Sequence, residues 1–449
     1  MNSMPEVLRN LLVNLADRAE IERYVKRFAS VDPSKFAIVK VGGGVLRDDL
    51  ADVASALAFL YRMGLFPVVV HGAGPQLDAA IEEAALENRR VDGMRVTSPE
   101  ILNIMRKVIH AESLKLVDAL TERKAPARPI TGGVFEASWL DSERLGMVGD
   151  VDRVHLEPIT AAIRAGQLPI VACVGETTTG QILNLNADVA ARSLAVATIP
   201  HKLVFLTPTG GLLDEGGNVI PAINLAEDYE RLSREPWVTG GMAVKLQEIK
   251  QVLDVLPRSS SVSITSPEHL AGELFTDRGS GTLVRQGETI ETHHDLSNLD
   301  FETVHTLLEC AFDRTVSPDY LENLEPLIVY LASDSSAIAI LTEQLGMPYL
   351  DKFAVTAESQ GAGLGASLWN RITEDNPRLF WRSRTDSPFN AWYFKKADGS
   401  WKTGDWVVYW YGLETAEEVT ACRDHAIALP ETVAPPNSQV SEQRNGDQP

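Results

Sequence analysis

The stretches FAIVKVGGG (36–44) and LFPVVVHGAGP (65–75) decide the fold class of this sequence. Each joins a short, mostly apolar run to a glycine-bearing turn, and helical patterns follow at 48–63 and 76–86. Apolar strands that alternate with helices are typical of a parallel sheet covered on both faces. We therefore predict an α/β unit with an open, mostly parallel sheet sandwiched by helices. Further strands of this kind are expected at 168–175, 202–207 and 260–265.

A second pattern begins after the polar stretch 287–298, which we predict to be a linker following a first domain at 1–286. The chain beyond it is rich in β-type runs with few helices, which indicates a separate α+β domain over 299–428. Residues 429–449 are rich in Pro, Gln, Ser and Asn, so we expect a disordered tail. An amphipathic helix is expected at 5–28. Strands are expected in the second domain at 327–333, 336–343, 349–356, 378–384, 391–394 and 405–413.

Composition and charge limit the classes of protein to which this sequence can belong. The 449 residues suit two or three domains and carry a formal net charge of -21. This charge argues against nucleic acid or an anionic membrane as the main partner, and no run approaches the roughly 20 apolar residues that span a bilayer. Cys173, Cys310 and Cys422 lie far apart without metal-ligand spacing. We expect buried structural thiols in a reducing cytoplasm, with neither disulfides nor a structural zinc site.

Three glycine-bearing turns follow predicted strands, at Gly42–Gly44, Gly72–Gly74 and Gly210–Gly211. In open α/β sheets, ligands bind outside the carboxyl ends of the strands, where the N–H groups of such turns can approach an anion closely. Strand-to-helix turns also use glycine for geometry alone, so each turn by itself leaves both interpretations open. No Walker motif occurs, which disfavours a P-loop fold.

Two lysines stand in matching contexts, Lys40 just before Gly42 and Lys245 just after a glycine pair at 240–241. A transferring phosphoryl group gathers negative charge, and its catalysis is mostly positioning and electrostatics. A solvated surface charge is the ordinary alternative for a lysine. That alternative is less favoured for Lys40, because burying a lysine between apolar strand residues is costly without an anionic partner.

These turns, together with GMRVT (93–97), NLNAD (184–188) and GGMAVK (240–245), resemble the N-acetylglutamate kinases of the amino-acid kinase family. The order and separation of the motifs agree from about residue 36 to 285. The resemblance implies the amino-acid kinase fold, ATP with magnesium as the phosphoryl donor, and the side-chain carboxylate of N-acetylglutamate as the acceptor.

The resemblance also implies a role for each matching residue. Lys40 and Lys245 would stabilise the transition state, and Asp188 would hold and orient both lysines. Arg95 would grip the substrate α-carboxylate, and Asn184 would hydrogen-bond the acetylamino group. Gly43, Gly44, Gly72, Ala73 and Gly74 would offer N–H groups to the substrate carboxylate and the γ-phosphate, while Thr207, Gly210, Gly211, Gly240, Gly241 and Met242 would border the ATP.

The sequence departs from this family in two places. The second turn carries Ala73 where three glycines are usual, which is tolerable only if the φ angle of Ala73 is negative. Pro208 removes one N–H donor from the nucleotide segment. Both departures concern the geometry of ATP rather than the choice of acceptor.

The string QGAGLG (360–365) follows a predicted strand and begins a helix with Leu364, Leu368 and Ile372 at i, i+4 and i+8. A pyrophosphate on N–H groups at a helix N-terminus accounts for such a string, and a glycine-rich helix cap is the alternative. The string fits the pattern of GNAT-type acetyltransferases. That resemblance implies that Gln360, Gly361, Gly363 and Gly365 would cradle the pyrophosphate of coenzyme A.

The aromatic-rich segment 378–401, preceded by LDKF (350–353), resembles the acetyltransferase domain of vertebrate-type N-acetylglutamate synthases and bacterial synthase/kinases. The resemblance covers about residues 300–415 and implies acetyl-CoA as the donor and glutamate as the acceptor. Tyr393 would lie beside the reacting amine or thiolate as a general acid or orienting hydroxyl, with core packing as the alternative. Lys352, Arg382 and Arg384 would hold the carboxylates of glutamate, and Asn390 a polar group nearby.

Three functional hypotheses follow. The first is a bifunctional enzyme for two early steps of arginine biosynthesis, and the second is a synthase whose kinase-like domain serves arginine sensing and assembly. The third is a kinase with a degenerate acetyltransferase appendage. The joint presence of Lys40, Asp188 and Lys245 favours an active kinase, and the intact QGAGLG string with Lys352 and Tyr393 disfavours the third hypothesis.

A further resemblance concerns regulation. Residues 273–282 are similar to the arginine-binding end of feedback-inhibited family members, which implies that Glu273, Gly279 and Gly281 would contact an arginine effector. An ordinary turn closing the last strand is the alternative. The family also implies a homo-oligomer, with a tetramer as the expected assembly.

Overall fold

The fold is taken from a computed structural model of the chain. The structure divides into two compact units, with the boundary between Gln286 and Gly287 and the short piece Ala226–Asp228 grouped with the second unit. The predicted helix at 5–28 lies outside the described residues. The described residues are 37–434, except 92, 239, 259, 276–280, 298, 358 and 361–362.

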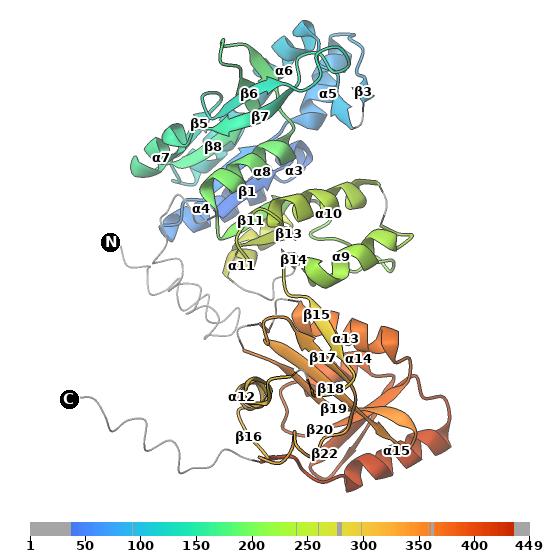
Figure 1. The fold of residues 1–449 in the computed structure, drawn as a ribbon. Coiled ribbons are helices and arrows are strands. Elements are labelled where there is room, and N and C mark those ends of the chain that lie inside the picture. The colour runs from blue at the N-terminus through green and yellow to red at the C-terminus, as the bar shows by residue number, and fades with distance from the viewer. Residues whose placement is uncertain are drawn as a thin grey trace, which may run out of the picture. The chain divides into compact units, whose positions relative to one another are not determined.

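An eight-stranded sheet forms the centre of the first unit, in the order β12-β14-β13-β11-β1-β2-β8-β5 (Figure 1). Neighbouring strands run parallel except β13 and β14, which confirms the predicted mostly parallel sheet. The strands are β1 (Ala37–Val41), β2 (Val68–His71), β5 (Ala127–Ile130), β8 (Leu168–Ala172), β11 (Lys202–Leu206), β12 (Ala222–Asn224), β13 (Ser261–Thr265) and β14 (Thr282–Arg285).

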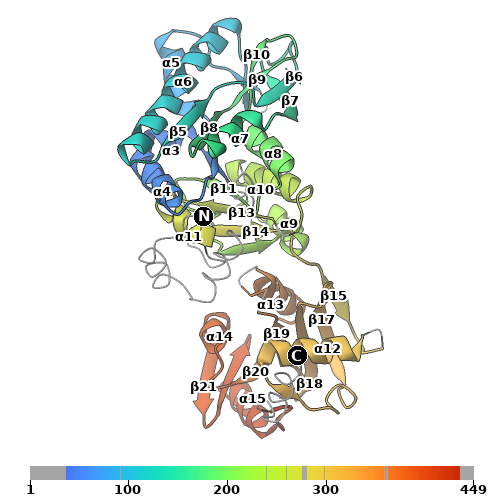
Figure 2. The same ribbon diagram turned by 90° about the vertical axis from the view of Figure 1, so that its left-hand side faces the viewer.

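Helices cover both faces of this sheet (Figures 1 and 2). Successive side chains of β1 point to opposite faces, so Ile38 joins one hydrophobic core while Val39 and Val41 join the other. Lys40 therefore shares the face of Ile38. The helices are α3 (Gly43–Asp48), α4 (Leu50–Arg62), α5 (Gly74–Glu83), α6 (Pro99–Glu122), α7 (Glu157–Arg164), α8 (Ala187–Thr198), α9 (Leu225–Arg234), α10 (Gly240–Leu253) and α11 (Leu270–Phe275), with a short 3-10 turn at Pro267–His269.

Two small sheets extend the carboxyl edge of the large one. A two-stranded sheet carries Arg95. A four-stranded sheet has the order β10-β9-β6-β7, and its strand β10 ends at Asn184, just before α8. The stretch predicted as one strand at 168–175 is divided at Cys173 between β8 and β9. The additional strands are β3 (Arg90–Val91), β4 (Met94–Arg95), β6 (Phe135–Trp139), β7 (Gly149–Val154), β9 (Val174–Glu176) and β10 (Ile182–Asn184).

The second unit is built on a seven-stranded sheet in the order β15-β17-β18-β19-β20-β22-β21, which confirms the predicted α+β domain. Its neighbours are antiparallel except β19 and β20, which pair in parallel at Tyr349 and Phe380. The strands are β15 (Ile290–His293), β16 (Thr315–Val316), β17 (Pro326–Ala332), β18 (Ala337–Gln344), β19 (Met347–Val355), β20 (Leu379–Arg384), β21 (Gly399–Thr403), β22 (Trp406–Tyr411) and β23 (Val433–Ala434), and the helices are α12 (Phe301–Phe312), α13 (Leu364–Asp375), α14 (Asn390–Lys396) and α15 (Ala416–Ala428).

Several local predictions were wrong. The glycine turn at 42–44 is not a loop throughout, because Gly43 and Gly44 already belong to α3. The expected strand at 391–394 lies in α14, whose buried Asn390 and Tyr393 share one helical face at i, i+3 spacing. The expected linker at 287–298 contains β15, which pairs with β17.

Two further expectations need correction. Residues 429–434 of the expected tail are part of the fold, because β23 pairs with β16, while 435–449 lie outside the described residues. Cys173 and Cys422 are buried, but Cys310 is exposed on α12. Among the described residues, no helix has the length and apolar character needed to cross a membrane.

Candidate active sites

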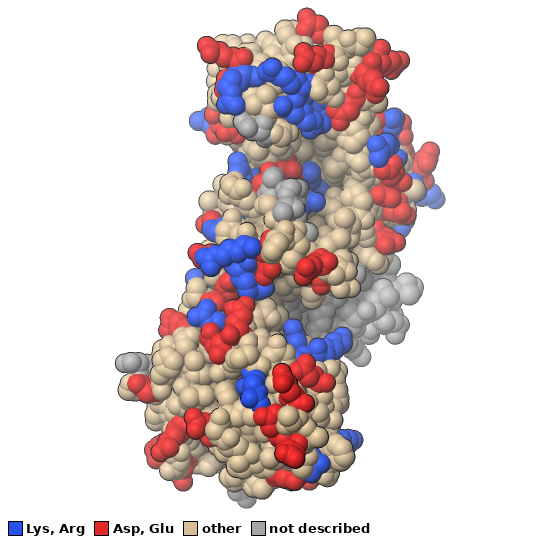
Figure 3. All heavy atoms as spheres, turned by 90° about the vertical axis from the view of Figure 1, so that its right-hand side faces the viewer, with Lys and Arg blue, Asp and Glu red and all other residues tan. Residues whose placement is uncertain are grey.

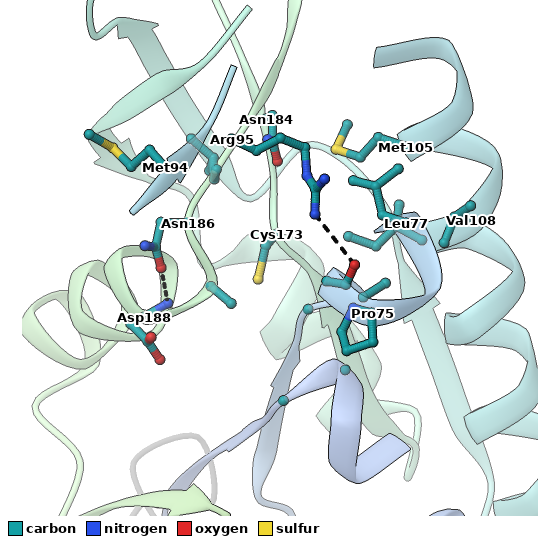
Figure 4. Close-up of a pocket in the computed structure, with 18 of the residues that line it drawn as sticks. Pro75, Leu77, Met94, Arg95, Met105, Val108, Cys173, Asn184, Asn186 and Asp188 are labelled. Atoms are coloured by element: carbon teal, nitrogen blue, oxygen red, sulfur yellow. Dashed lines mark hydrogen bonds between the residues drawn. The ribbon is translucent and has the colours of Figure 1, made fainter. Parts of the chain in front are cut away.

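The first unit holds a cavity of about 380 Å³ at the carboxyl ends of β1 and β2 (Figure 4). Figure 3 shows Lys and Arg side chains gathered on part of one face of this unit. Arg90 is among the residues that line the cavity, so the acidic chain places a positive charge in this lining. The cavity brings together the predicted residues Lys40, Gly43, Gly72, Ala73, Gly74, Arg95, Asn184 and Asp188.

Lys40 and Asp188 form an ion pair in this cavity. Lys40 Nζ lies 2.6 Å from Asp188 Oδ1, with the two side chains only 15% and 29% exposed. Asp188 lies in the first turn of α8, where Asn186 caps the helix by accepting from the Asp188 N–H at 2.7 Å (Figure 4). The structure thus places Asp188 against Lys40, while the role of Asp188 in orienting both lysines stays a prediction.

Lys245 lies on α10, close enough to the same pair to be affected by its charges. Burial lowers the pKa of Lys245, the positive charge of Lys40 lowers it further, and Asp188 opposes both effects. Two ammonium groups held around one carboxylate are suited to a ligand that brings more negative charge than that carboxylate alone.

Glu248 was missed by the sequence reasoning. It lies three residues after Lys245 on α10, and burial raises its pKa to about 7, with the neighbouring Asp188 adding to the increase. The spacing Lys-x-x-Glu on a helix is a possible signal for such a neighbour, but it also occurs on solvated helices.

The two glycine turns contact each other closely. A Cβ atom at Gly43 would lie 2.8 Å from the backbone N of Gly74 and 2.9 Å from Cα of Ala73, so a side chain has no room there. The φ angle of Ala73 is -140°, which is negative, as an alanine at this position requires. Gly44 is not among the residues that line the cavity, although it directly follows Gly43 in α3.

Gln76 ties these turns to α6 and was also missed. Its Nε2 donates to the Gly43 carbonyl oxygen at 2.8 Å and to Glu112 Oε2 at 3.2 Å. Glu112 is buried on α6 and also accepts from Lys115 at 2.6 Å. One amide therefore fixes the position of the Gly43 turn relative to a long helix.

Arg95 reaches the cavity from β4 and is held by neighbours that the sequence reasoning did not identify. Its Nη2 lies 2.6 Å from Asp78 Oδ1 and donates to the Gly74 carbonyl oxygen at 3.4 Å, while Nη1 donates to Asn88 (Figure 4). Asn184 Nδ2 donates to Thr97 Oγ1 at 3.1 Å. Arg95 and Asn184 line the cavity together with Lys40 and Asp188, and Figure 4 shows both residues apart from Asp188.

The residues predicted to border ATP are not among those that line this cavity. The Thr207 N–H donates to the Thr265 carbonyl oxygen at 2.9 Å, and Gly210 has a left-handed φ of +70°. A Cβ atom at Gly211 would lie 2.9 Å from Thr282 Oγ1. Gly240, Gly241 and Met242 form the first turn of α10.

Two of the residues predicted to bind arginine contact each other. Glu273 is buried on α11, and its Oε1 accepts from the Gly281 N–H at 2.6 Å. The carbonyl oxygen of Glu273 accepts from Lys202. Gly279 lies outside the described residues. The Glu273 carboxylate thus already has a partner within the protein.

The second unit holds a cavity of about 260 Å³ beside β19 and β20. It brings together the predicted residues Lys352, Arg382, Arg384 and Tyr393. Tyr393 is buried, and its ring centroid lies 5.6 Å from that of Trp381 and 6.3 Å from that of Phe353. Burial raises the pKa of Tyr393 well above its ordinary value, so its hydroxyl is protonated at neutral pH.

The cations of this cavity already have partners. Lys352 Nζ donates to Asp351 Oδ2 at 2.9 Å and to Thr432 Oγ1 at 2.8 Å. Arg384 Nη1 donates to Glu431 Oε1 at 2.9 Å. Arg382 donates to four carbonyl oxygens, those of Ala426, Ile427, Leu429 and Pro430.

Arg382 and Asn390 both donate hydrogen bonds to backbone carbonyl groups of the protein. The carbonyl oxygens on Arg382 come from the end of α15 and the residues after it, where unpaired carbonyl groups attract a cation. Asn390 is not among the lining residues, and its Nδ2 donates to the Arg384 carbonyl oxygen at 2.8 Å. Asn390 thereby fixes the backbone that carries Arg384.

The predicted coenzyme A turn precedes α13. Gly363 has a left-handed φ of +94° and occupies the N-cap position, which favours glycine. Gln360 Nε2 donates to the Val355 carbonyl oxygen at 3.1 Å, and Gly365 has room on its Cβ side except for Val355 at 3.5 Å. Gly361 lies outside the described residues.

Comparison with known proteins relates both units to enzyme families. The amino acid kinase family matches residues 35–256, and the N-acetyltransferase domain of N-acetylglutamate synthase matches residues 291–427. The chain is 49% identical over 416 residues to acetylglutamate kinase from Xanthomonas campestris pv. campestris, covering 92% of this chain and 98% of that protein. It is 33% identical over 415 residues to mitochondrial N-acetylglutamate synthase from Homo sapiens, covering 90% of this chain and 74% of that protein.

A solved structure shares the fold of both units. It is N-acetylglutamate synthase from Neisseria gonorrhoeae complexed with coenzyme A and N-acetyl-glutamate. The TM-score is 0.57 at 19% identity, covering 88% of this chain and 98% of that one.

Proposed function

Because the chain belongs to the acetylglutamate kinases of the amino-acid kinase family and carries the N-acetyltransferase domain of N-acetylglutamate synthases, we propose that it catalyses two consecutive reactions. The second domain acetylates L-glutamate with acetyl-CoA. The first phosphorylates the side-chain carboxylate of N-acetyl-L-glutamate with ATP. Together these are early steps of arginine biosynthesis. The observation that carries the kinase proposal is the partly buried Lys40–Asp188 ion pair, whose charges also act on Lys245.

In the kinase reaction, an oxygen of the substrate side-chain carboxylate attacks the γ-phosphorus, and the bond from that phosphorus to the bridging oxygen of ADP breaks. Lys40 and Lys245 stabilise the charge that gathers on the transferring group, and Asp188 keeps both lysines oriented. Arg95 holds the substrate α-carboxylate, and Asn184 holds its acetylamino group. The separation of these two residues from the lysine pair sets the direction in which the substrate lies.

The glycine turns fit a polyphosphate. Gly43, Gly72 and Gly74 line the cavity, and the close contacts at Gly43 leave no room for a side chain in that turn. ATP supplies the phosphoryl group. We propose that its magnesium is held mainly by the phosphates, since the described residues include no cluster of three His, Cys, Asp or Glu side chains suited to a metal.

In the acetyl transfer, the amine nitrogen of glutamate attacks the thioester carbonyl carbon, the carbon–sulfur bond breaks, and the coenzyme A sulfur takes a proton. The protonated hydroxyl of Tyr393 on the cavity wall is suited to supply that proton or to orient the amine. Lys352 and Arg384 hold the carboxylates of glutamate. Arg382 shapes this pocket through its carbonyl partners.

The main alternative is a synthase whose first unit only senses arginine and supports assembly. The partly buried Lys40–Asp188 pair argues against it, because a module without catalysis has no need for a cation held at the proposed phosphoryl position. Inhibition by arginine through Glu273 and Gly281 remains a separate prediction, as does a homo-oligomeric assembly. Millimolar arginine should slow one of the two reactions if the regulatory prediction is right.

Two assays on the purified chain test the proposal. ADP release with N-acetylglutamate and ATP tests the kinase, and coenzyme A release with glutamate and acetyl-CoA tests the acetyltransferase. We expect both products. Coenzyme A without ADP would establish the synthase-only alternative, and ADP without coenzyme A would leave the second domain without its proposed reaction.

A further inference from the structure

The six residues after α15, Leu429 to Ala434, form an edge of the acetyltransferase cavity, and we call them the strap. Glu431, Thr432 and Val433 of the strap line the cavity directly. The strap is attached at its far end by the pairing of β23 with β16 and by a bond from the Ser317 N–H to the Thr432 carbonyl oxygen at 3.0 Å. It is therefore an ordered wall of the pocket rather than a loose tail.

The strap contacts all three cations that were predicted to bind glutamate. Its Thr432 hydroxyl accepts from Lys352 at 2.8 Å, and its carbonyl oxygens accept from Arg382. Its Glu431 carboxylate accepts from Arg384 at 2.9 Å. The last of these contacts differs in kind, because a carboxylate on a cation is the same interaction that a bound amino-acid substrate would make.

The three contacts differ in how readily a substrate carboxylate can displace them. Lys352 is only 5% exposed and keeps Asp351 as a second partner, so its interaction with Thr432 is part of a buried network. The side chain of Glu431 is 50% exposed, and that of Arg384 is 30% exposed. Half-exposed ion pairs contribute little to stability, so another carboxylate can displace one of the partners.

The other groups around Arg384 do not take the place of Glu431. Asp386 lies 4.0 Å from Arg384 Nε and is 67% exposed. The ring of Trp406 faces the guanidinium at 5.3 Å from its centroid. Among the described residues, Glu431 therefore makes the closest charged contact with Arg384, at the guanidinium nitrogen Nη1.

We propose that Glu431 is an internal stand-in for the substrate carboxylate, which occupies Arg384 until glutamate displaces it. This inference rests on the proposed function, in which Arg384 holds a carboxylate of the acceptor. The internal carboxylate competes with substrate and so raises the glutamate concentration needed for half-maximal rate. It also keeps Arg384 paired and correctly oriented in the free enzyme. Glu431 thus sets how tightly the acceptor binds and takes no part in the chemical step.

The substitution Glu431→Gln in the full chain tests this role. It removes the competing charge and keeps the size of the side chain. We expect the KM for glutamate to fall about two- to five-fold, in line with the modest strength of a half-exposed pair, while kcat changes less than the KM does. Glu414→Gln is the matched control, because Glu414 is an exposed glutamate outside the cavity lining, and its KM should equal that of the wild type.

Coenzyme A release at varied glutamate concentrations separates the outcomes. If the wild type releases coenzyme A and Glu431→Gln lowers the KM, the inference stands. An unchanged or increased KM in Glu431→Gln, with the wild type active, would overturn the inference and leave the acetyltransferase proposal intact. A wild type that releases no coenzyme A would overturn both.

Discussion

Lys40 is a charged residue in the central strand of a buried sheet, and Asp188 makes that position possible. An unpaired ammonium group at 15% exposure would lose much of its hydration, whereas the carboxylate at 2.6 Å compensates for that loss. The same pair leaves Lys40 directed into the cavity, where a phosphoryl group can share it. The ion pair therefore offsets the cost of burying Lys40 and keeps its ammonium group available to a phosphoryl group.

Replacing Lys40 with alanine should abolish most kinase activity. Loss of one preorganised charge donor at a reacting oxyanion costs about 10²- to 10³-fold in kcat, so we expect ADP release to fall by that factor. Coenzyme A release from glutamate should stay close to the wild-type rate, because Lys40 belongs to the first unit. Phosphorylation at an undiminished rate in Lys40→Ala would refute the role assigned to this lysine.

Glu248 should make stability depend on pH. Its pKa is about 7 in the folded chain, raised from 4.5 chiefly by burial. Between these values the folded state binds more protons than the unfolded state, so the free energy of unfolding falls as pH rises through this window. Glu248→Gln cannot ionise and escapes this loss.

The expected result is a higher thermal unfolding midpoint for Glu248→Gln than for the wild type at about pH 8, with a smaller difference at about pH 5. The comparison between variant and wild type cancels the other titrating groups. A difference that is the same at both pH values would show that Glu248 titrates normally in the folded chain.

At the scale of elements, the two glycine turns and α6 act as one assembly. Gly43 contacts the turn at 73–74 closely, and Gln76 connects the Gly43 carbonyl oxygen to Glu112 on α6. The backbone N–H groups of both turns are thereby fixed relative to each other before any ligand arrives. This preorganisation is what a phosphate-binding cradle requires.

Gly43→Ala should therefore damage the kinase. The new methyl group would meet backbone atoms at 2.8 and 2.9 Å, so the two turns must separate. Misplacement of reacting groups by about 1 Å costs roughly 10²-fold, and we expect a loss of that order in ADP release. Gly44→Ala places the same methyl group where nothing lies within 4 Å, so it should lose far less. Equal losses in both variants would show that the contact at Gly43 is not the cause.

The sequence allowed the parallel sheet, the two units and the Lys40–Asp188 pair to be predicted, because each depends on local pattern or on a motif at a strand end. It did not reveal Gln76, whose partner Gly43 lies 33 positions away. Nor did it show that Arg382 binds carbonyl groups 44 to 48 residues later. Contacts of one side chain with a distant backbone leave no local periodicity.

The prediction of a strand at 391–394 was wrong for a related reason. Its aromatic composition favours strands, but burial of Asn390 and Tyr393 on one face suits a helix in this position. Similarly, the composition of 429–434 suggested disorder, whereas the cations of the cavity and β16 bind it in place. In both cases tertiary contacts outweighed local propensity.

At the scale of the whole molecule, the central claim is that one chain makes N-acetylglutamate and then phosphorylates it. The product of the second unit is the acceptor of the first, so the two reactions can be linked in one vessel without any added intermediate. The two sites lie in separate compact units, so each can be disabled alone.

The most direct measurement supplies the purified chain with glutamate and ATP and follows ADP release before and after acetyl-CoA is added. We expect ADP release to begin only after acetyl-CoA is present. In Tyr393→Phe this release should be strongly reduced, but it should be normal when N-acetylglutamate replaces glutamate. Absence of ADP with all three substrates, or with N-acetylglutamate and ATP alone, would contradict the account.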